Sequence, residues 1–186
     1  EENNKLPDEV VRYKDNPDGF FDAEEYFNVA DYYESEIDLD SAFEAIRRGL
    51  SAYPSDVPLR YENARLHIVS GDFDGAEKLF DALLADDDYV TDPADVVSVL
   101  LMLAKIHIEQ CDIKSIEHEV KHVDEWISSK LSDDIAIDSY LDYATSLYQC
   151  FMYKYAVKVL KKGHNRFPNN LQILESIIEC YVRDKA

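Results

Sequence analysis

Residues 24–54 read "EEYFNVADYYESEIDLDSAFEAIRRGLSAYP", and residues 138–168 read "DSYLDYATSLYQCFMYKYAVKVLKKGHNRFP". When the two stretches are aligned on their closing prolines, tyrosine, alanine, glycine and proline recur at the same places without a gap. The matched pairs are Tyr26 with Tyr140, Ala30 with Ala144, Ala42 with Ala156, Ile46 with Leu160, Gly49 with Gly163, and Pro54 with Pro168. Self-similarity at a fixed interval is typical of chains that copy one structural unit, so the sequence predicts a repeat architecture.

Two weaker copies lie between these stretches, at "LRYENARLHIVSGDFDGAEKLFDAL" and "LLMLAKIHIEQCDIKSIEHEVKHV". One alanine anchors each copy, and the intervals between successive anchors are 34, 40 and 40 residues. The anchors are Ala30, Ala64, Ala104 and Ala144. The third copy departs from the pattern, because Ile116 stands where the others have a small residue. Six extra residues precede the third copy and six precede the fourth, so we expect longer connections there.

The residues within each copy predict a pair of packed helices. Small side chains at Ala30 and Ala42 allow two helices to approach closely, while larger residues between them fill the gaps. Asp22 followed by Glu25 is the pattern of a capped helix start, with the two side chains bonding each other's backbone amides. Each hairpin buries only part of its apolar surface alone, so neighbouring hairpins must stack.

This pattern resembles the tetratricopeptide repeat (TPR), a helix-turn-helix unit of 34 residues. In the first copy the resemblance rests on Tyr26, Val29, Ala30, Tyr33, Ala42, Ile46 and Pro54. It implies an all-α fold, a right-handed solenoid of about four TPR-like repeats followed by a terminal helix.

The expected organisation is a lead-in segment, residues 1–21, with room for a short helix, and a single superhelical domain, residues 22–183. The repeats are expected at 23–56, 57–90, 97–130 and 137–170, with the terminal helix at 171–183. That helix has a wide apolar surface, which includes Leu171, Leu174, Ile178 and Tyr181. It is either a capping helix or the first helix of a truncated repeat. The wide apolar surface favours truncation or burial against another molecule, and self-association through it is one option.

The composition bounds the class of protein. The chain has 186 residues, 46% of them apolar, and only 5 glycines and 6 prolines, which favours a folded helical domain. The net charge of −20 repels nucleic acid and anionic membranes, so neither is an expected partner. The charge is uneven, because residues 1–149 have a net charge of −24 and residues 150–186 a net charge of +4.

The cysteines and the missing motifs indicate a compartment. Cys111, Cys150 and Cys180 are far apart and odd in number, which favours free thiols in a reducing, cytoplasmic environment. No run of 18 apolar residues predicts a membrane-spanning helix, and no signal peptide is visible. The chain begins "EENNK" without a methionine, so a processed start would hide a targeting signal.

Residues 118–122 read "HEVKH", the H-E-x-x-H spacing of zinc peptidases, in which two histidines one helical turn apart bind the metal. The apolar residues of the expected helix, which include Ile116, Val120 and Val123, cluster on one side. His118 and His122 then lie on the opposite, solvent-facing side. We therefore interpret them as surface histidines and predict no metal, no catalytic residue and no cofactor.

The TPR resemblance implies that first helices line a concave groove that binds a peptide or a helix. The residues in register with that groove are Phe27, Asp31, Tyr61, Arg65, Ile68, Leu101, Lys105, Ile108, Leu141 and Tyr148. Arg65 and Lys105 would add adjacent positive charge, which suits a segment that carries an acidic residue. An equally open alternative is that part of these rows packs against neighbouring helices.

The sequence therefore predicts a non-enzymatic scaffold for protein–protein interaction, whose partner is a protein or peptide of unknown identity. One alternative is a structural spacer within a longer chain or assembly. A remote alternative is a zinc-dependent hydrolase that uses the 118–122 motif.

Overall fold

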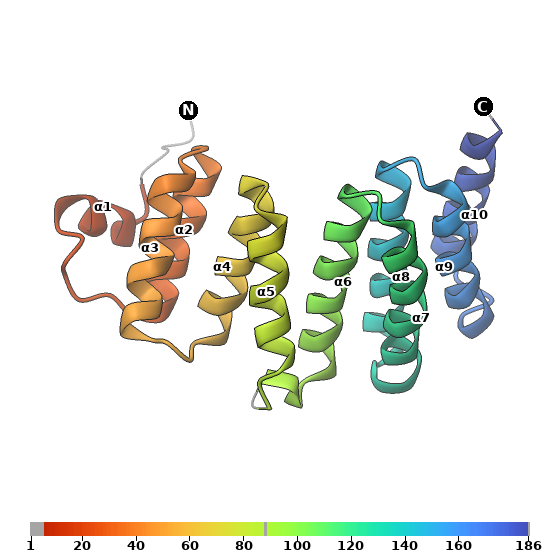
Figure 1. The fold of residues 1–186 in the computed structure, drawn as a ribbon, viewed down its shortest axis with the longest axis horizontal. Coiled ribbons are helices and arrows are strands. Elements are labelled where there is room, and N and C mark those ends of the chain that lie inside the picture. The colour runs from red at the N-terminus through yellow and green to blue at the C-terminus, as the bar shows by residue number, and fades with distance from the viewer. Residues whose placement is uncertain (1–5, 88, 186) are drawn as a thin grey trace. The chain divides into compact units, whose positions relative to one another are not determined.

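The computed structural model describes residues 6–87 and 89–185, except for the side chains of residues 90, 117, 119 and 122. Within this part of the chain every regular element is a helix (Figure 1). The elements are α1 (Asp8–Asp15), α2 (Ala23–Ser35), α3 (Leu39–Ala52), α4 (Val57–Ser70), α5 (Phe73–Leu84), the 3₁₀ helix η1 (Tyr89–Thr91), α6 (Pro93–Glu109), α7 (Ile113–Lys130), α8 (Asp133–Gln149), α9 (Tyr153–Arg166) and α10 (Leu171–Asp184). The all-α prediction is confirmed.

The helices group into two compact units, residues 1–83 and residues 84–186. In the first unit α2 and α4 are neighbours, α3 packs on both, and α1 packs on α2. In the second unit α6, α8 and α10 pack side by side as one layer, and α7 and α9 form a second layer against them. The prediction of a single domain over residues 22–183 stays a prediction.

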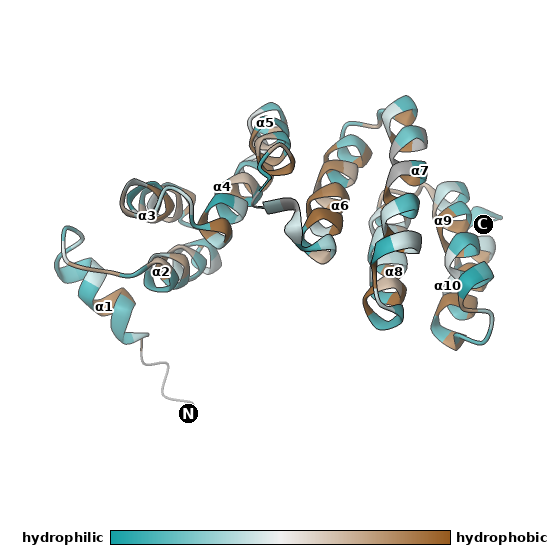
Figure 2. Ribbon diagram, turned by 90° about the horizontal axis from the view of Figure 1, so that it is seen from below, coloured by the Kyte–Doolittle hydropathy of each residue, from teal (hydrophilic) through white to brown (hydrophobic). Residues whose placement is uncertain are grey.

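Each unit has its own apolar core. In the first unit, Val29 of α2 and Ile46 of α3 are fully buried beneath Leu59 of α4. In the second unit the core runs through all five helices, and α6, which supplies buried residues from Val96 to Ile108, is brown along most of its length in Figure 2. Burial of such faces supplies most of the driving force for folding.

The turns inside the hairpins share one backbone geometry. The residue seven places after each anchor alanine has a left-handed conformation, with φ of 63° at Ile37, 81° at Gly71, 55° at Cys111 and 61° at Phe151. In each turn the next amide donates to the carbonyl five residues earlier, at 2.9 Å. This is the bonding pattern that closes many helix C-termini. Four equivalent turns confirm the helix-turn-helix repeat.

Two glycines mark where three helices meet. A Cβ atom on Gly49 would lie 2.9 Å from Leu59 Cδ1 and 3.0 Å from Tyr26 Cβ, so α2, α3 and α4 meet at this point. A Cβ atom on Gly163 would lie 3.1 Å from the Tyr140 ring and 3.2 Å from Ile173 Cδ1, which joins α8, α9 and α10. The aligned pairs Tyr26–Tyr140 and Gly49–Gly163 therefore occupy equivalent places in the two units.

The helix starts follow the sequence signals. The Glu25 amide donates to Asp22 Oδ1 at 2.9 Å, and the Asp22 amide donates to Glu25 Oε2 at 3.0 Å, which confirms the predicted cap of α2. The expected long connection before the fourth repeat is wrong, because only two residues separate α7 from α8. The extra residues instead lengthen helices: α7 has 18 residues and α8 has 17, against 14 in α3 and α4. No glycine or proline in "SSKLSDDIA" stops the helix earlier.

Candidate functional site

The predicted groove residues of the first unit lie on α2 and α4. Phe27, Tyr61 and Ile68 are half-buried, and Asp31 is exposed. The Tyr61 ring packs edge-on against Phe80 of α5, with 5.6 Å between ring centroids. The apolar members are therefore partly used in packing.

Arg65 is held inside the first unit by two carboxylates. Its Nε donates to Glu62 Oε2 at 2.8 Å, and its Nη1 donates to Glu34 Oε1 of α2 at 3.0 Å. Its Nη2 bonds both carboxylates, with Glu62 Oε1 at 2.6 Å. Glu62 is 3% exposed, so Arg65 neutralises an almost fully buried charge, and these carboxylates raise the pKa of the guanidinium. The positive charge expected from Arg65 in the groove is therefore balanced within the fold.

A hollow of about 600 Å³ lies beside Phe27, between the starts of α2 and α4. Three of its seven lining residues are acidic, namely Asp22, Glu24 and Asp56. Asp22 and Asp56 already accept bonds from backbone amides at the starts of α2 and α4. This hollow contains helix caps, so it offers few uncommitted polar groups.

The predicted groove residues of the second unit divide into core and surface. Ile108 and Leu141 are buried, at 1% and 9% exposed, and belong to the core. Leu101 and Tyr148 are half-buried, and Lys105 is exposed on α6. Ile108 is thus occupied by packing between helices, while Leu101, Lys105 and Tyr148 reach the surface.

A second hollow, of about 280 Å³, opens between α8 and α10, and we name it the α8–α10 hollow. It is lined by Leu141, Ala144, Thr145, Tyr148, Gln149, Leu160, Ser176, Glu179 and Cys180. Two predicted groove residues, Leu141 and Tyr148, therefore line one depression. The sequence indicated α10 as a terminal helix and did not indicate that it forms a wall of this hollow.

Hydrogen bonds fix the rim of the α8–α10 hollow. The Tyr148 hydroxyl donates to Glu179 Oε1 at 2.7 Å and accepts a bond from Arg183 Nε at 3.1 Å. The bond to Glu179 raises the pKa of the Tyr148 hydroxyl above its ordinary value. Burial raises the pKa of the Cys180 thiol, which therefore stays protonated at neutral pH. The hollow has an apolar floor with a thiol and one polar wall.

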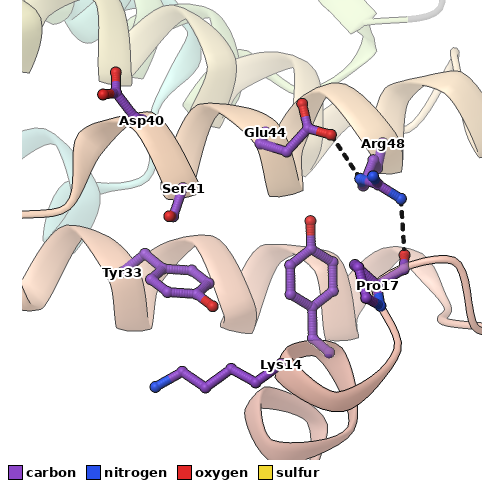
Figure 3. Close-up of a pocket in the computed structure, with 8 residues that line it drawn as sticks. Lys14, Pro17, Tyr33, Asp40, Ser41, Glu44 and Arg48 are labelled. Carbon is purple, nitrogen blue, oxygen red and sulfur yellow. Dashed lines mark hydrogen bonds and ion pairs between the residues drawn. The ribbon is translucent and has the colours of Figure 1, made fainter.

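A third hollow, of about 410 Å³, lies between α1, α2 and α3 (Figure 3). Arg48 of α3 spans it, donating to Glu44 Oε1 at 2.7 Å and to the Pro17 carbonyl at 3.0 Å. Arg47 and Arg48 together lower the pKa of Glu44 to about 2. Burial raises the pKa of Tyr13, which also lines the hollow, to about 12. These contacts tie the lead-in segment to the first hairpin, which is a structural role.

The zinc motif lies on α7. His118 is exposed there, and the side chains of Glu119 and His122 lie outside the described residues. Among the described residues no group of three His, Cys, Asp or Glu side chains is placed to hold a metal ion. His67, another histidine of the sequence, bonds locally through Nδ1 to Asp72 Oδ2 at 2.8 Å. In residues 6–87 and 89–185 no helix is long and apolar enough to cross a membrane.

The chain was compared with known families, proteins and structures. The sequence model of the tetratricopeptide repeat matches residues 35–89. No curated protein matches the sequence. A tetratricopeptide repeat protein from Parabacteroides merdae ATCC 43184 shares the fold, with a TM-score of 0.56 and 11% identity over 95% of this chain. This chain spans 64% of the length of that protein.

Two further solved structures match less well. MamA has a TM-score of 0.48 and 15% identity, covering 88% of this chain and 82% of its own. YrrB, described as a TPR protein with an unusual peptide-binding site, has a TM-score of 0.45 and 15% identity, covering 91% of this chain and 97% of its own. The sequence match shows a tetratricopeptide repeat over residues 35–89, and the likeness to the Parabacteroides protein shows that this chain shares its fold.

Proposed function

We propose that the chain is a non-enzymatic scaffold that binds a peptide or a helix of a partner protein in the α8–α10 hollow. Stacked helical repeats present extended surfaces to partners, which supports the general role. The observation that carries the specific proposal is the α8–α10 hollow, because it lies on the layer of first helices and contains the predicted groove residues Leu141 and Tyr148.

The size of the hollow favours a side chain over a small molecule. Its volume of about 280 Å³ lies just below the range of roughly 300–1,000 Å³ that is usual for small-molecule sites. A leucine or an aromatic side chain of a bound segment would contact Ala144, Leu160 and Cys180 on the floor. Burying such an anchor contributes about 1.5–3 kcal/mol.

The rim would fix the backbone of the bound segment. Thr145 and Gln149 are exposed on α8, one turn apart, and Glu179 faces them from α10. Their side chains supply both donors and acceptors to a peptide backbone. Lys105 of α6, the one exposed residue among the predicted groove residues of this unit, offers a positive charge to an acidic residue of the partner.

A filling substitution tests this proposal. Thr145→Trp should occupy the hollow without removing a buried group, because Thr145 is exposed. The matched control is Ser128→Trp, on an exposed position of α7. Peptides selected from a random library on the wild-type chain should bind Ser128→Trp unchanged and bind Thr145→Trp at least about tenfold more weakly. If every selected peptide binds all three proteins alike, the hollow is not the site and the spacer alternative takes its place.

We also propose that the protein works in a reducing, cytoplasmic compartment. The supporting observation is that Cys111, Cys150 and Cys180 are all free thiols. Free thiols persist where glutathione and thioredoxin keep cysteine reduced. Localisation of a tagged protein in intact cells tests this proposal.

A further inference from the structure

α10 presents an apolar stripe that nothing in its unit covers. Leu171 is 72% exposed, Ile178 62%, Val182 63% and Tyr181 43%. These residues, together with half-buried Leu174, are the α10 stripe. Ile173 and Cys180, on the other side of the helix, are buried against the rest of the unit. In the described part of the chain, the other exposed large apolar residues occur one to a helix or turn. The α10 stripe is thus the one grouped apolar surface there, and such patches mark interaction sites.

Ile178 distinguishes α10 from α2 and α4, the helices that begin the first two hairpins. It lies eight residues after the capping residue Asn170, just as Ala30 follows Asp22 and Ala64 follows Asp56. Both alanines are fully buried. An isoleucine in this place keeps a covering helix farther away than alanine does. The α10 stripe is therefore shaped for a helix other than the second helix of such a hairpin.

A row of lysines borders the stripe. Lys154, Lys158 and Lys161 lie on one exposed face of α9, at spacings of four and three residues, and form the lysine row. Lys161 Nζ lies 5.5 Å from the centroid of the Tyr181 ring, so the row meets the α10 stripe there. The neighbouring cations turn inward: Lys162 Nζ donates to Asp124 Oδ2 at 2.5 Å, and Arg166 Nη1 donates to the Ile127 carbonyl at 2.7 Å.

We propose that the α10 stripe and the lysine row together dock an amphipathic helix of a partner protein, with acidic residues along one edge of its apolar face. The apolar face would cover Ile178 and Val182, and the acidic edge would face Lys154 and Lys161. Charge complementarity selects this partner, since residues 150–186 carry a net charge of +4 in a chain of −20. A second copy of this chain fits poorly, because its acidic helices show no exposed apolar stripe within the described residues. This surface is separate from the α8–α10 hollow.

Two designed peptides test the proposal. Both are helix-stabilised and carry the same leucine stripe, but one has glutamates along its edge and the other has lysines. Fluorescence anisotropy with the whole chain should show that the glutamate peptide binds and the lysine peptide does not. Ile178→Asn should weaken the binding at least about tenfold, whereas Ile135→Asn, at an isolated exposed isoleucine of α8, should leave it unchanged.

Charge variants distinguish an effect of the lysine row on binding from an effect of the net charge of the protein. Lys154→Glu with Lys161→Glu should weaken binding of the glutamate peptide and reduce its salt dependence. Lys114→Glu with Lys130→Glu, on α7, makes the same change in net charge and should have little effect. Equal binding of both peptides, or of wild type and Ile178→Asn, would overturn the proposal. Sedimentation that shows a dimer lost in Ile178→Asn would also overturn it, by assigning the surface to a second copy.

Discussion

At the residue scale, the four hairpin turns share a left-handed backbone conformation that residue type alone does not reveal. Each requires a left-handed residue, yet only Gly71 is a glycine. Ile37, Cys111 and Phe151 hold a conformation that costs an L-residue roughly 1–2 kcal/mol. Glycine adopts a left-handed conformation readily, so residue type alone is consistent with the turn at Gly71. The constant spacing of seven residues from each anchor alanine could have revealed the other three.

Ile37→Gly should therefore stabilise the protein. Ile37 is 87% exposed, so its loss removes little buried surface, while glycine relieves the left-handed strain. We expect the free energy of unfolding in urea to rise by about 1 kcal/mol. Ile135→Gly, in the first turn of α8, should lower it by roughly 0.5–1 kcal/mol, because glycine disfavours the helical conformation. A shift in the same direction for both variants would contradict the turn assignment.

The charge of Arg65 was expected to be available in the groove, whereas the structure pairs it with Glu62 and Glu34. Its partner Glu34 comes from the preceding hairpin, and a repeat register does not reveal which way a long side chain turns. Arg65→Met should lower the free energy of unfolding by about 1–3 kcal/mol, because Glu62 is left buried without its cation. Arg47→Met removes an exposed pair with Glu44 and should cost under about 0.5 kcal/mol. Equal losses in the two variants would mean that the Arg65 network does not stabilise the fold.

At the element scale, the close contact between hairpin helices depends on small side chains. Ala156 of α9 is fully buried in the core shared with α8. Ala156→Leu should overpack this contact and lower the free energy of unfolding by roughly 1–3 kcal/mol. Asp138→Leu, on the exposed side of α8, is the control and should change it by less than about 0.5 kcal/mol. Identical melting of Ala156→Leu and wild type would show that the repeat register is wrong.

The helices and their pairing into hairpins were largely predictable from the sequence, but the lengths of the helices were not. The Asp22 cap and the recurring alanines predicted where hairpins begin and how they pack. The extra residues before the fourth repeat were expected in a loop, whereas they extend α7 and α8. Anchor spacing counts the residues between two positions but does not say whether they are helical. This segment has no glycine or proline, and only two residues interrupt the helices there.

At the scale of the whole molecule, capping carboxylates link stability to pH. Asp38, Asp72 and Asp112 accept bonds from amides at the starts of α3, α5 and α7. Their pKa values are lowered chiefly by Ser41, His67 and Ser115 respectively. Because the folded pKa lies below the unfolded value of about 3.9, each group stabilises the protein above pH 4 and loses that contribution as the pH falls further.

Urea unfolding from pH 5 to pH 2 measures this effect. Wild-type stability should fall steadily below about pH 4. The variant with Asp38→Asn, Asp72→Asn and Asp112→Asn should show a shallower acid limb, because asparagine caps a helix without titrating. If the acid limbs of the two proteins have the same slope, the capping carboxylates do not control the acid sensitivity.

The fold class and the repeat unit were predictable from the sequence, while the burial of the candidate groove residues was predictable only in part. Of the residues placed in register with a groove, Leu141 and Tyr148 line the α8–α10 hollow, whereas Ile108 is part of the core. Burial depends on which neighbouring helix covers a position, and a single repeat does not specify its neighbours. The partner itself is not encoded in this pattern, since one fold supports many functions.

Site-specific photocrosslinking tests the central claim most directly. A benzophenone amino acid at position 145, within the α8–α10 hollow, is compared in native lysate with one at position 128 on α7. The account predicts a protein captured from position 145 and not from position 128, and loss of that capture when a peptide spanning its crosslinked segment is added in excess. Capture of the same proteins from both positions, unaffected by the peptide, would contradict it.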